Sequence, residues 1–282
     1  MPEFDPFTEG FLDDPYAAYA VLREDDPVHW SERLRTWVLT RYDDVQLFFR
    51  DPRFSADRSR AEKFRGTKSP LRSIGSDPPE HTAVRALASR AFTPRRVEAL
   101  RQRVAEIVDQ LIDALDDRES FDLIDDFAYP FPITVICEMF GVPEADRPQV
   151  QEWSRLMARS MDHMYSRRGD GGGGALLGQY FAGLVAERMR EPGDDLITQM
   201  LEAEDGGDSL TTAEVISLCA VLVFAGHETT TNLIGNGMLA LLRDPSEGER
   251  LRSGDVSSAA AVEELLRFDS PAQMISRAMA GL

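Results

Sequence analysis

Apolar residues recur every three or four positions along much of the chain, which is the spacing of a helix face. The clearest stripe spans 95–115 and predicts a strongly amphipathic helix, with apolar residues at Val97, Leu100, Val104, Ile107, Val108, Leu111, Ile112 and Leu115. Shorter patterns predict helices over 15–25, over 42–51 and from Pro130 to Met139, and a strand of an early hairpin over 35–40. There is no repeat and no clear linker, so we expect a single, mainly helical domain over 1–282 with a small β-sheet.

A long helix is predicted from Thr212 to Arg243. Thr211 and Glu214 have the spacing of a capping box at its start, and Pro245 follows its end. At about 1.5 Å per residue this helix is about 48 Å long, enough to cross a domain. The unbroken apolar run from Val215 to Gly226 is too short to span a bilayer, so we expect a helix of the protein core.

This helix contains a polar step, Ala225-Gly226-His227-Glu228-Thr229-Thr230. Buried polar groups are costly unless they are paired or used, so the carboxylate and hydroxyls indicate a working site. We also expect the helix to open locally at Gly226, because glycine weakens a helix and threonines can bond back to carbonyls one turn earlier. The alternative is a packed helix whose threonines bond their own backbone and whose Glu228 caps a neighbouring element.

Two further groups of residues stand at helical spacing. His81 and Arg85 lie four residues apart within 77–96 and present adjacent donors suited to a carboxylate or a phosphate. Glu264 and Arg267 lie three apart and can form an ion pair. Each spacing is common by itself, but the three groups in this order are specific.

Together with motifs along the whole chain, these residues resemble the cytochrome P450 family of haem-thiolate monooxygenases, in particular its soluble bacterial members. The matching segments are Asp14-Pro15-Tyr16, Val28-His29-Trp30, 36–45, Phe54-Ser55, 77–96, Phe140-Gly141-Val142-Pro143, 192–196, 225–230, 264–267 and Ser270-Pro271. The resemblance implies a mainly α fold with a long central helix. It also implies haem as cofactor and insertion of one oxygen atom of dioxygen into a small organic substrate, with electrons from a redox partner.

Residue by residue, the resemblance implies that His81, Arg85 and Arg277 bind the haem propionates, and that Ala225 and Gly226 also contact the cofactor. Glu228 and Thr229 would be the acid–alcohol pair that steers protons and water on the oxygen side. Glu264 and Arg267 would form a buried pair that braces the opposite side of the fold. His227 occupies a variable position of the motif, and we assign it no chemistry.

Members of the family continue for roughly another hundred residues, about the size of a small domain, and that stretch carries the cysteine that ligates iron. We therefore expect a truncated chain with no metal ligand and no activity alone. Cys137 and Cys219 lie in apolar helices without a glycine-rich loop and are expected to be inert core residues. The alternative is a non-catalytic helical remnant or a regulatory fragment. A zinc protease is excluded, because His227-Glu228 lacks a second histidine one turn on.

Composition limits the cellular location and the partners that we expect. Two cysteines fit a reducing compartment, and the first residues show no signal peptide or anchor, so we expect a cytoplasmic protein without membrane contact. The net charge of −18 disfavours nucleic acid and anionic membranes as partners. The stretch 81–103 is nevertheless basic. The family resemblance implies that this region borders the face where an electron donor docks, and a basic patch there would fit an acidic ferredoxin-type donor. For Arg101 and Arg103 the alternative is a solvated helix face. Over 169–174, a glycine-rich link is expected between helices ending near Asp162 and beginning near Ala175. The family resemblance implies that this area lies over the substrate entrance, where four residues would line or cover a pocket: Met157, Met161, Met164 and Tyr165. The alternative for each of them is ordinary packing.

Overall fold

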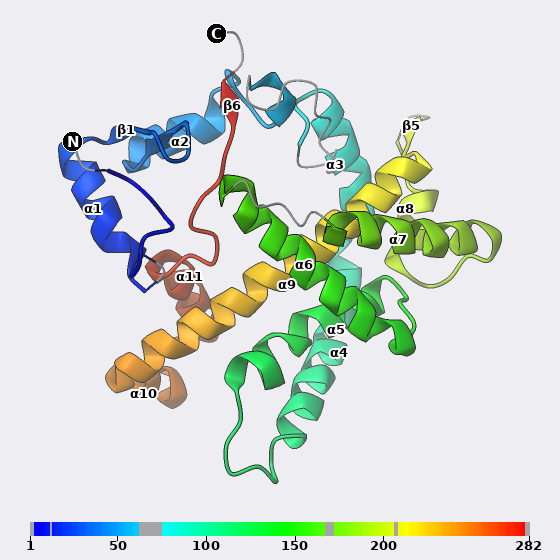
Figure 1. Ribbon diagram of the computed structural model, residues 1–282. Coiled ribbons are helices and arrows are strands. Elements are labelled where there is room, and N and C mark those ends of the chain that lie inside the picture. Colours follow the sequence, from blue (N-terminus) through cyan, green and yellow to red (C-terminus); the bar gives the residue numbers. More distant parts are fainter. Residues whose placement is uncertain (1–2, 12, 62–74, 167–171, 206–207, 280–282) are drawn as a thin grey trace. The chain divides into compact units, whose positions relative to one another are not determined.

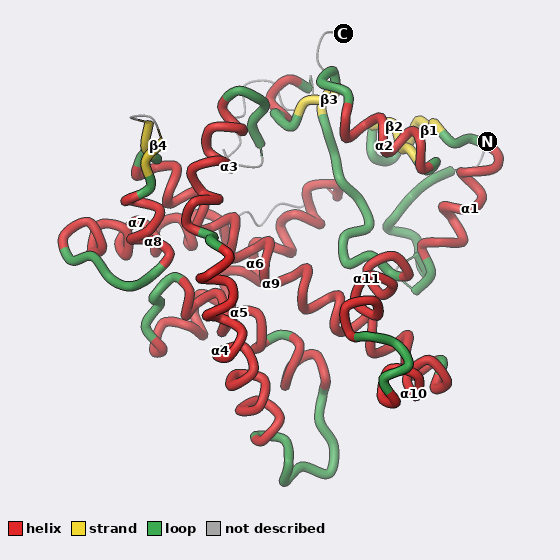
Figure 2. Tube along the Cα trace, turned by 180° about the vertical axis from the view of Figure 1, so that it is seen from behind, coloured by secondary structure: helices red, strands yellow, loops and turns green. Residues whose placement is uncertain are grey.

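The computed structural model describes residues 3–11, 13–61, 75–166, 172–205 and 208–279. The chain forms two compact units. The first comprises Met1–Lys68, Asp162–Gly169 and Arg277–Leu282, and the second comprises Ser69–Met161 and Asp170–Ser276. Helices dominate the described residues, and the strands form three separate two-stranded antiparallel sheets (Figure 2). The prediction of a mainly helical chain with little sheet is confirmed.

The first unit begins with α1 (Pro15–Asp25), which the Asp14 side chain caps at its N-terminus. A hairpin of β1 (Val28–Ser31) and β2 (Thr36–Leu39) follows, then α2 (Tyr42–Arg50) and a single 3₁₀ turn, η1 (Arg58–Arg60). Trp30 and Trp37 are direct cross-strand partners in the hairpin, with their rings edge to face and 5.4 Å between centroids. The short strand β3 (Phe54–Ser55) pairs with β6 (Ala278–Met279), which comes from the other end of the sequence. A small core holds the unit together, made of Phe4, Phe11, Leu22 and Leu34.

The second unit contains the remaining helices, except that the end of α6, from Asp162, belongs to the first unit (Figure 1). In chain order these are α3 (Glu80–Ala91), α4 (Pro94–Asp113), the π-helical turn η3 (Ile124–Ala128), α5 (Pro130–Met139), η4 (Glu144–Asp146), α6 (Arg147–Ser166), α7 (Gly172–Arg190) and α8 (Leu196–Glu202). After the two-residue strands β4 (Glu204–Asp205) and β5 (Asp208–Ser209) come α9 (Thr212–Arg243), α10 (Pro245–Ser253) and α11 (Ser258–Phe268). The core lies where α5 and α7 pack on α9.

The long helix α9 has the predicted bounds, and its capping box is present in both directions. Glu214 N–H donates to Thr211 Oγ1, and Thr211 N–H donates to Glu214 Oε2. The predicted opening at Gly226 is wrong, because α9 is helical without interruption. The glycine instead permits close packing, since a Cβ at Gly226 would lie 2.6 Å from Cδ1 of Ile136 on α5.

By length and hydropathy, α9 is the one helix of the described residues that qualifies as a membrane span, although the apolar run by itself is short. The core helix of a soluble protein passes the same test, and α5, α7 and α8 pack against this one. Both cysteines are fully buried, Cys137 on α5 and Cys219 on α9, which confirms their prediction as core residues.

The helices around the glycine-rich link are longer than the sequence predicts. α6 continues past Asp162 to Ser166, and α7 begins at Gly172 rather than near Ala175. Gly173 lies within α7, and α6 approaches it so closely that a Cβ would overlap the backbone of Trp153 and Met157. The link itself, 167–171, lies outside the described residues.

Candidate functional site

The polar step lies in the middle of α9, and its residues face different surroundings. Ala225 and Thr229 are exposed, Gly226 and Glu228 are half-buried, and His227 is fully buried. The Thr229 hydroxyl donates to the Ala225 carbonyl, with 2.5 Å between oxygens. This is the backbone bond that the packed-helix alternative expects. It uses the hydrogen of Thr229 and leaves its oxygen free to accept from a water or a ligand.

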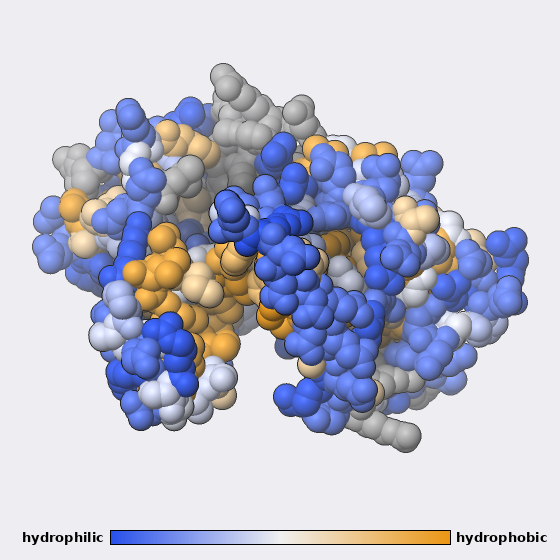
Figure 3. All heavy atoms as spheres, turned by 90° about the horizontal axis from the view of Figure 1, so that it is seen from below, coloured by the Kyte–Doolittle hydropathy of each residue, from blue (hydrophilic) through white to orange (hydrophobic). Residues whose placement is uncertain are grey.

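An apolar pocket of 310 Å³ adjoins the step. It joins the C-terminal end of α3 to α5, α8 and α9, and its lining residues are Phe92, Ile136, Met139, Phe140, Leu196, Leu222, Ala225 and Gly226. A second pocket, of 260 Å³, lies where α9 meets α10 and α11. In the space-filling view, clusters of apolar residues reach the surface between hydrophilic helices (Figure 3).

His227 is the best-enclosed residue of the step, although the sequence pattern assigned it no chemistry. Its Nδ1 shares a 3.0 Å hydrogen bond with Oγ of the buried Ser154 on α6, and Nε2 has no hydrogen-bond partner. Burial lowers the pKa of His227 to about 4, and the positive charge of Arg155 adds to this, while the backbone of Tyr129 acts in the opposite direction. The ring is therefore neutral at pH 7. The missed signal was an ionisable residue inside an apolar run.

The buried Tyr129 packs against His227. Its ring packs edge to face on His227 at 4.3 Å between centroids, and the Arg155 guanidinium lies over the Tyr129 ring, 4.4 Å from its centroid. Arg155 Nε also donates to the Tyr129 hydroxyl, at 3.2 Å. Burial raises the pKa of this hydroxyl, so it stays protonated at neutral pH. Tyr129 thus contacts both the buried histidine of the step and Arg155.

The predicted propionate ligands divide between the two units. His81 is half-buried and Arg85 exposed on one face of α3, and within the described residues neither side chain makes an ion pair. The two side chains are therefore adjacent donors that no carboxylate of the described residues pairs with. Arg277 belongs to the first unit, where its guanidinium lies 5.9 Å from the ring centre of Phe49.

Glu264 and Arg267 on α11 form the predicted pair, with Arg267 Nε 2.7 Å from Oε2 and Nη2 2.5 Å from Oε1. The expectation of burial is wrong, because their side chains are 58% and 70% exposed. α11 turns Leu265 towards α9 instead, where a Cβ on Gly237 would lie 2.9 Å from Leu265 Cδ1. The pair therefore points away from the packed side of its helix.

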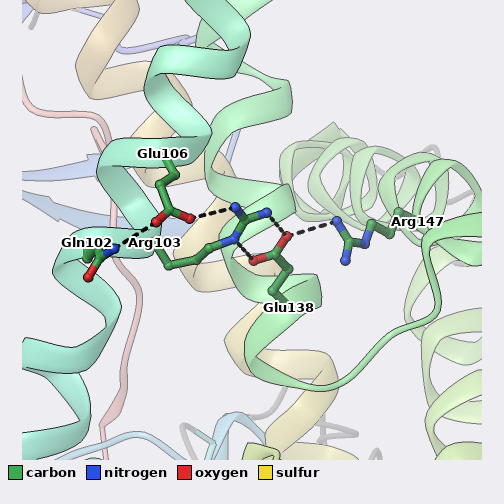
Figure 4. Close-up of polar contacts among 5 residues, drawn as sticks. All are labelled: Gln102, Arg103, Glu106, Glu138 and Arg147. Carbon is green, nitrogen blue, oxygen red and sulfur yellow. Dashed lines mark hydrogen bonds and ion pairs between the residues drawn. The ribbon is translucent and has the colours of Figure 1, made fainter.

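Among the described side chains of the basic stretch, Arg90, Arg101 and Arg103 bond to groups of the same chain. Arg103 grips Glu138 on α5 with two hydrogen bonds of 2.7 and 2.8 Å and also bonds Glu106, while Arg147 reaches the same Glu138 at 3.2 Å (Figure 4). The hydrogen bond from Arg103 lowers the pKa of Glu138, which stays charged. Arg101 pairs with Glu98 at 2.9 Å. The Arg101 and Arg103 side chains are 78% and 39% exposed, and each pairs with a glutamate three residues away on α4, which agrees with the alternative of a solvated helix face.

The remaining side chains that the sequence pattern named add no residue to the site within the described part of the structure. Met157 is a core residue, 4% exposed, as ordinary packing predicts. The side chains of Met161, Met164 and Tyr165, and those of Arg95 and Arg96, lie outside the described part of the structure.

Known proteins with the same pattern decide the family. The family model described as Cytochrome P450 matches residues 184–254. Cytochrome P450 107B1 of Saccharopolyspora erythraea is 38% identical over 96% of this chain and 70% of that protein. The chain belongs to the cytochrome P450 family. The Vitamin D(3) 25-hydroxylase of Pseudonocardia autotrophica is also 38% identical, over 95% of this chain and 68% of its own length.

Solved structures of cytochrome P450 enzymes share the fold. CYP109Q5 from Chondromyces apiculatus matches with a TM-score of 0.84 and 34% identity, over 98% of this chain and 70% of its own. P450BioI, solved with an acyl carrier protein carrying hexadec-9Z-enoic acid, matches with a TM-score of 0.84 and 32% identity, over 95% of this chain and 72% of its own. α9 corresponds to the long central helix of the fold. Members of the family are haem-dependent oxidoreductases, so the predicted family, fold class and cofactor are confirmed at that level.

Proposed function

We propose that these 282 residues supply the oxygen side and the propionate-binding donors of a haem-dependent monooxygenase. The observation that carries this is the step on α9, where Ala225 and Thr229 are exposed in mid-helix and Glu228 is half-buried. An apolar pocket lies directly beside it. This combination of an uncovered small residue, a hydroxyl and an acid suits a flat apolar cofactor with a reactive centre.

The donor set fits haem. Its propionates are carboxylates, and the side chains of His81, Arg85 and Arg277 carry N–H groups that can donate to them; within the described residues none of the three makes an ion pair. Ala225 and Gly226 offer little bulk where the ring would lie. When bound, haem supplies the redox-active iron at which dioxygen is activated.

The roles of the acid–alcohol pair follow from their positions. Thr229 has its hydrogen committed to the Ala225 carbonyl, so its oxygen accepts a hydrogen bond from a water and orients that water. Glu228 is next in the chain and only half-buried, so its carboxylate can take a proton from solvent and pass it inward. The exposed Glu264–Arg267 pair is proposed to hold α11 in its helical form.

The iron ligand is not among these residues. Both cysteines of the sequence are buried, and burial raises their thiol pKa, that of Cys137 to about 12. A thiol held in this way does not supply a thiolate to iron. We therefore propose that these residues alone do not catalyse. A non-catalytic helical fragment is the second candidate, and the same cysteine burial favours it.

The remaining proposals concern the setting. Cytochrome P450 monooxygenase PikC of Streptomyces venezuelae is one relative, which supports a small organic substrate. We further propose electrons from a ferredoxin-type donor and a cytoplasmic location without membrane contact. The net charge of −18 supports the absence of nucleic-acid partners.

Two measurements test this function. Mixed with haem, reduced and given carbon monoxide, the 282-residue chain should not show the red-shifted absorption of a thiolate-ligated iron. A strong band of that kind would mean that Cys137 or Cys219 ligates iron, and the assignment of both as core residues would fail.

The acid–alcohol pair is tested in a fusion that adds the C-terminal third of a relative such as Cytochrome P450 107B1. Thr229→Ala should keep haem and substrate binding and divert electrons from product to peroxide, and Glu228→Gln should slow the oxygen-dependent steps. Thr230→Val is the matched control, one residue further round the helix. Unchanged coupling and rate in both variants would show that protons arrive by another route.

A further inference from the structure

His227 lies inside the step that carries Glu228 and Thr229, and it is 0% exposed. Its Nδ1 bonds Ser154 Oγ at 3.0 Å, and Ser154 is itself 0% exposed. This bond ties the middle of α9 to α6. Tyr129, at the junction of η3 and α5, packs its ring edge to face against the His227 ring.

A second contact holds the same face of α9 one turn later. Thr231 is 4% exposed, and its hydroxyl donates to the Ala128 carbonyl at 3.0 Å. Successive residues of a helix are rotated by about 100°, so two anchored residues four apart fix the rotation of the turn between them. Glu228 and Thr230 flank the anchored face on opposite sides, and both are half-buried.

A histidine is a costly choice for a buried packing position. Its Nε2 is enclosed without a hydrogen-bond partner, a cost that an apolar side chain of similar size would avoid. What the histidine adds is one directional bond, and buried directional bonds select one arrangement among several that pack comparably.

We propose that His227 is a positioning residue: its bond to Ser154 and its contact with Tyr129 set the rotation of α9, and thereby the directions in which Glu228 and Thr229 point. This rests on the proposed function only in giving those two residues a purpose. The rotation itself is a property of the chain without cofactor.

Thiol labelling of the full chain measures that rotation. Glu228→Cys and Thr230→Cys each place one thiol beside the anchored face, while Cys137 and Cys219 stay buried and unreactive. When α9 rotates, one of the two positions becomes more exposed and the other less. In the His227→Phe background we expect the ratio of the two labelling rates to change at least fivefold, with the rates moving in opposite directions. Ser154→Ala, which removes a single atom, should shift the ratio the same way.

Two further variants sharpen the result. Asparagine carries a polar atom near the place of Nδ1, so His227→Asn should restore the ratio towards its original value. Ser31→Ala removes an equally buried hydroxyl, whose bond to the Phe4 carbonyl is also 3.0 Å, in the first unit, and should leave the ratio unchanged.

The proposal fails if the ratio stays within twofold in both His227→Phe and Ser154→Ala. It also fails if both rates rise together or helicity is lost, because the pair would then hold the fold and not the rotation. No haem or turnover enters the labelling, so a failure of Glu228 and Thr229 in oxygen chemistry would appear only in the coupling assay of the fusion.

Discussion

In α9 the apolar residues before the polar step are enclosed by protein, whereas those after it reach the surface. Val215, Cys219 and Val223 are all 0% exposed, but Leu239 is 47% and Leu242 is 69% exposed. The sequence pattern is apolar in both halves. The first half is covered by α5, α7 and α8, and the second meets mainly η3, α10 and α11. Apolar spacing therefore predicts which face of a helix is apolar, while neighbouring elements decide whether that face is buried.

The largest effect should come from placing the same charge in each half. Val223→Asp buries a carboxylate among apolar side chains without a partner and should lower the free energy of unfolding by about 4 kcal/mol or more. Leu242→Asp, at 69% exposed, should change it by less than about 0.5 kcal/mol. Urea unfolding followed by circular dichroism compares them. Equal losses would mean that the second half is as enclosed as the first.

The buried side of the polar step predicts a pH effect. The pKa of His227 is about 4 in the folded chain against an ordinary 6.5, so between these values the unfolded chain binds more protons. The contribution of neutral His227 to the free energy of unfolding is fully present above pH 6.5. It is lost as the pH falls to about 4, by up to about 3 kcal/mol. The difference in free energy of unfolding between the original chain and His227→Phe should follow this curve. A difference that is flat with pH would contradict it.

The close approach of α5 to α9 at Gly226 predicts a smaller loss of stability, which a second substitution should largely restore. Gly226→Ala should cost about 1–2 kcal/mol, because overpacking outweighs the better helix propensity of alanine. Ile136→Val removes the Cδ1 atom at 2.6 Å and leaves Cγ1 at 3.5 Å, so the double variant should recover most of the loss. Thermal melts of the two single variants and the double variant decide this. Additive losses would show that Ile136 is not the obstacle.

The smallest expected effect concerns the exposed apolar residues at the end of α9 and on α11. Leu242 and Phe268 are 69% and 57% exposed, so changing both to serine should reduce binding of a hydrophobic dye. The free energy of unfolding should move by less than about 0.5 kcal/mol. Ile112→Ser on α4, at 47% exposed, is the control for a general loss of apolar surface. If the double change destabilised the chain, the second half would need to be counted as core.

Local signals in the sequence were sufficient for much of the fold. The bounds of α9 follow from the capping box at Thr211 and the proline after Arg243, which act within a few residues. The pairing of Glu264 with Arg267 follows from their spacing of three. Its exposure does not, because burial depends on what packs against α11.

The rest depends on contacts between distant residues. Ser154 is 73 positions before His227, so no local sequence pattern predicts that the two side chains bond. Arg103 and Glu138 are 35 positions apart, so the sequence does not show that they pair. Because of this pairing, the charge of Arg103 serves a contact within the chain. The pairing of β3 with β6 involves two residues on each side, too few to leave an alternating pattern.

The hairpin of the first unit has an optical consequence. Trp30 and Trp37 are stacked edge to face, while Trp153, the third tryptophan of the chain, packs against Tyr180 in the second unit. Two indoles held this close couple electronically and give a paired circular-dichroism signal that vanishes when the strands separate. The first unit thus carries its own chromophore for folding, independent of the helical signal that the second unit dominates.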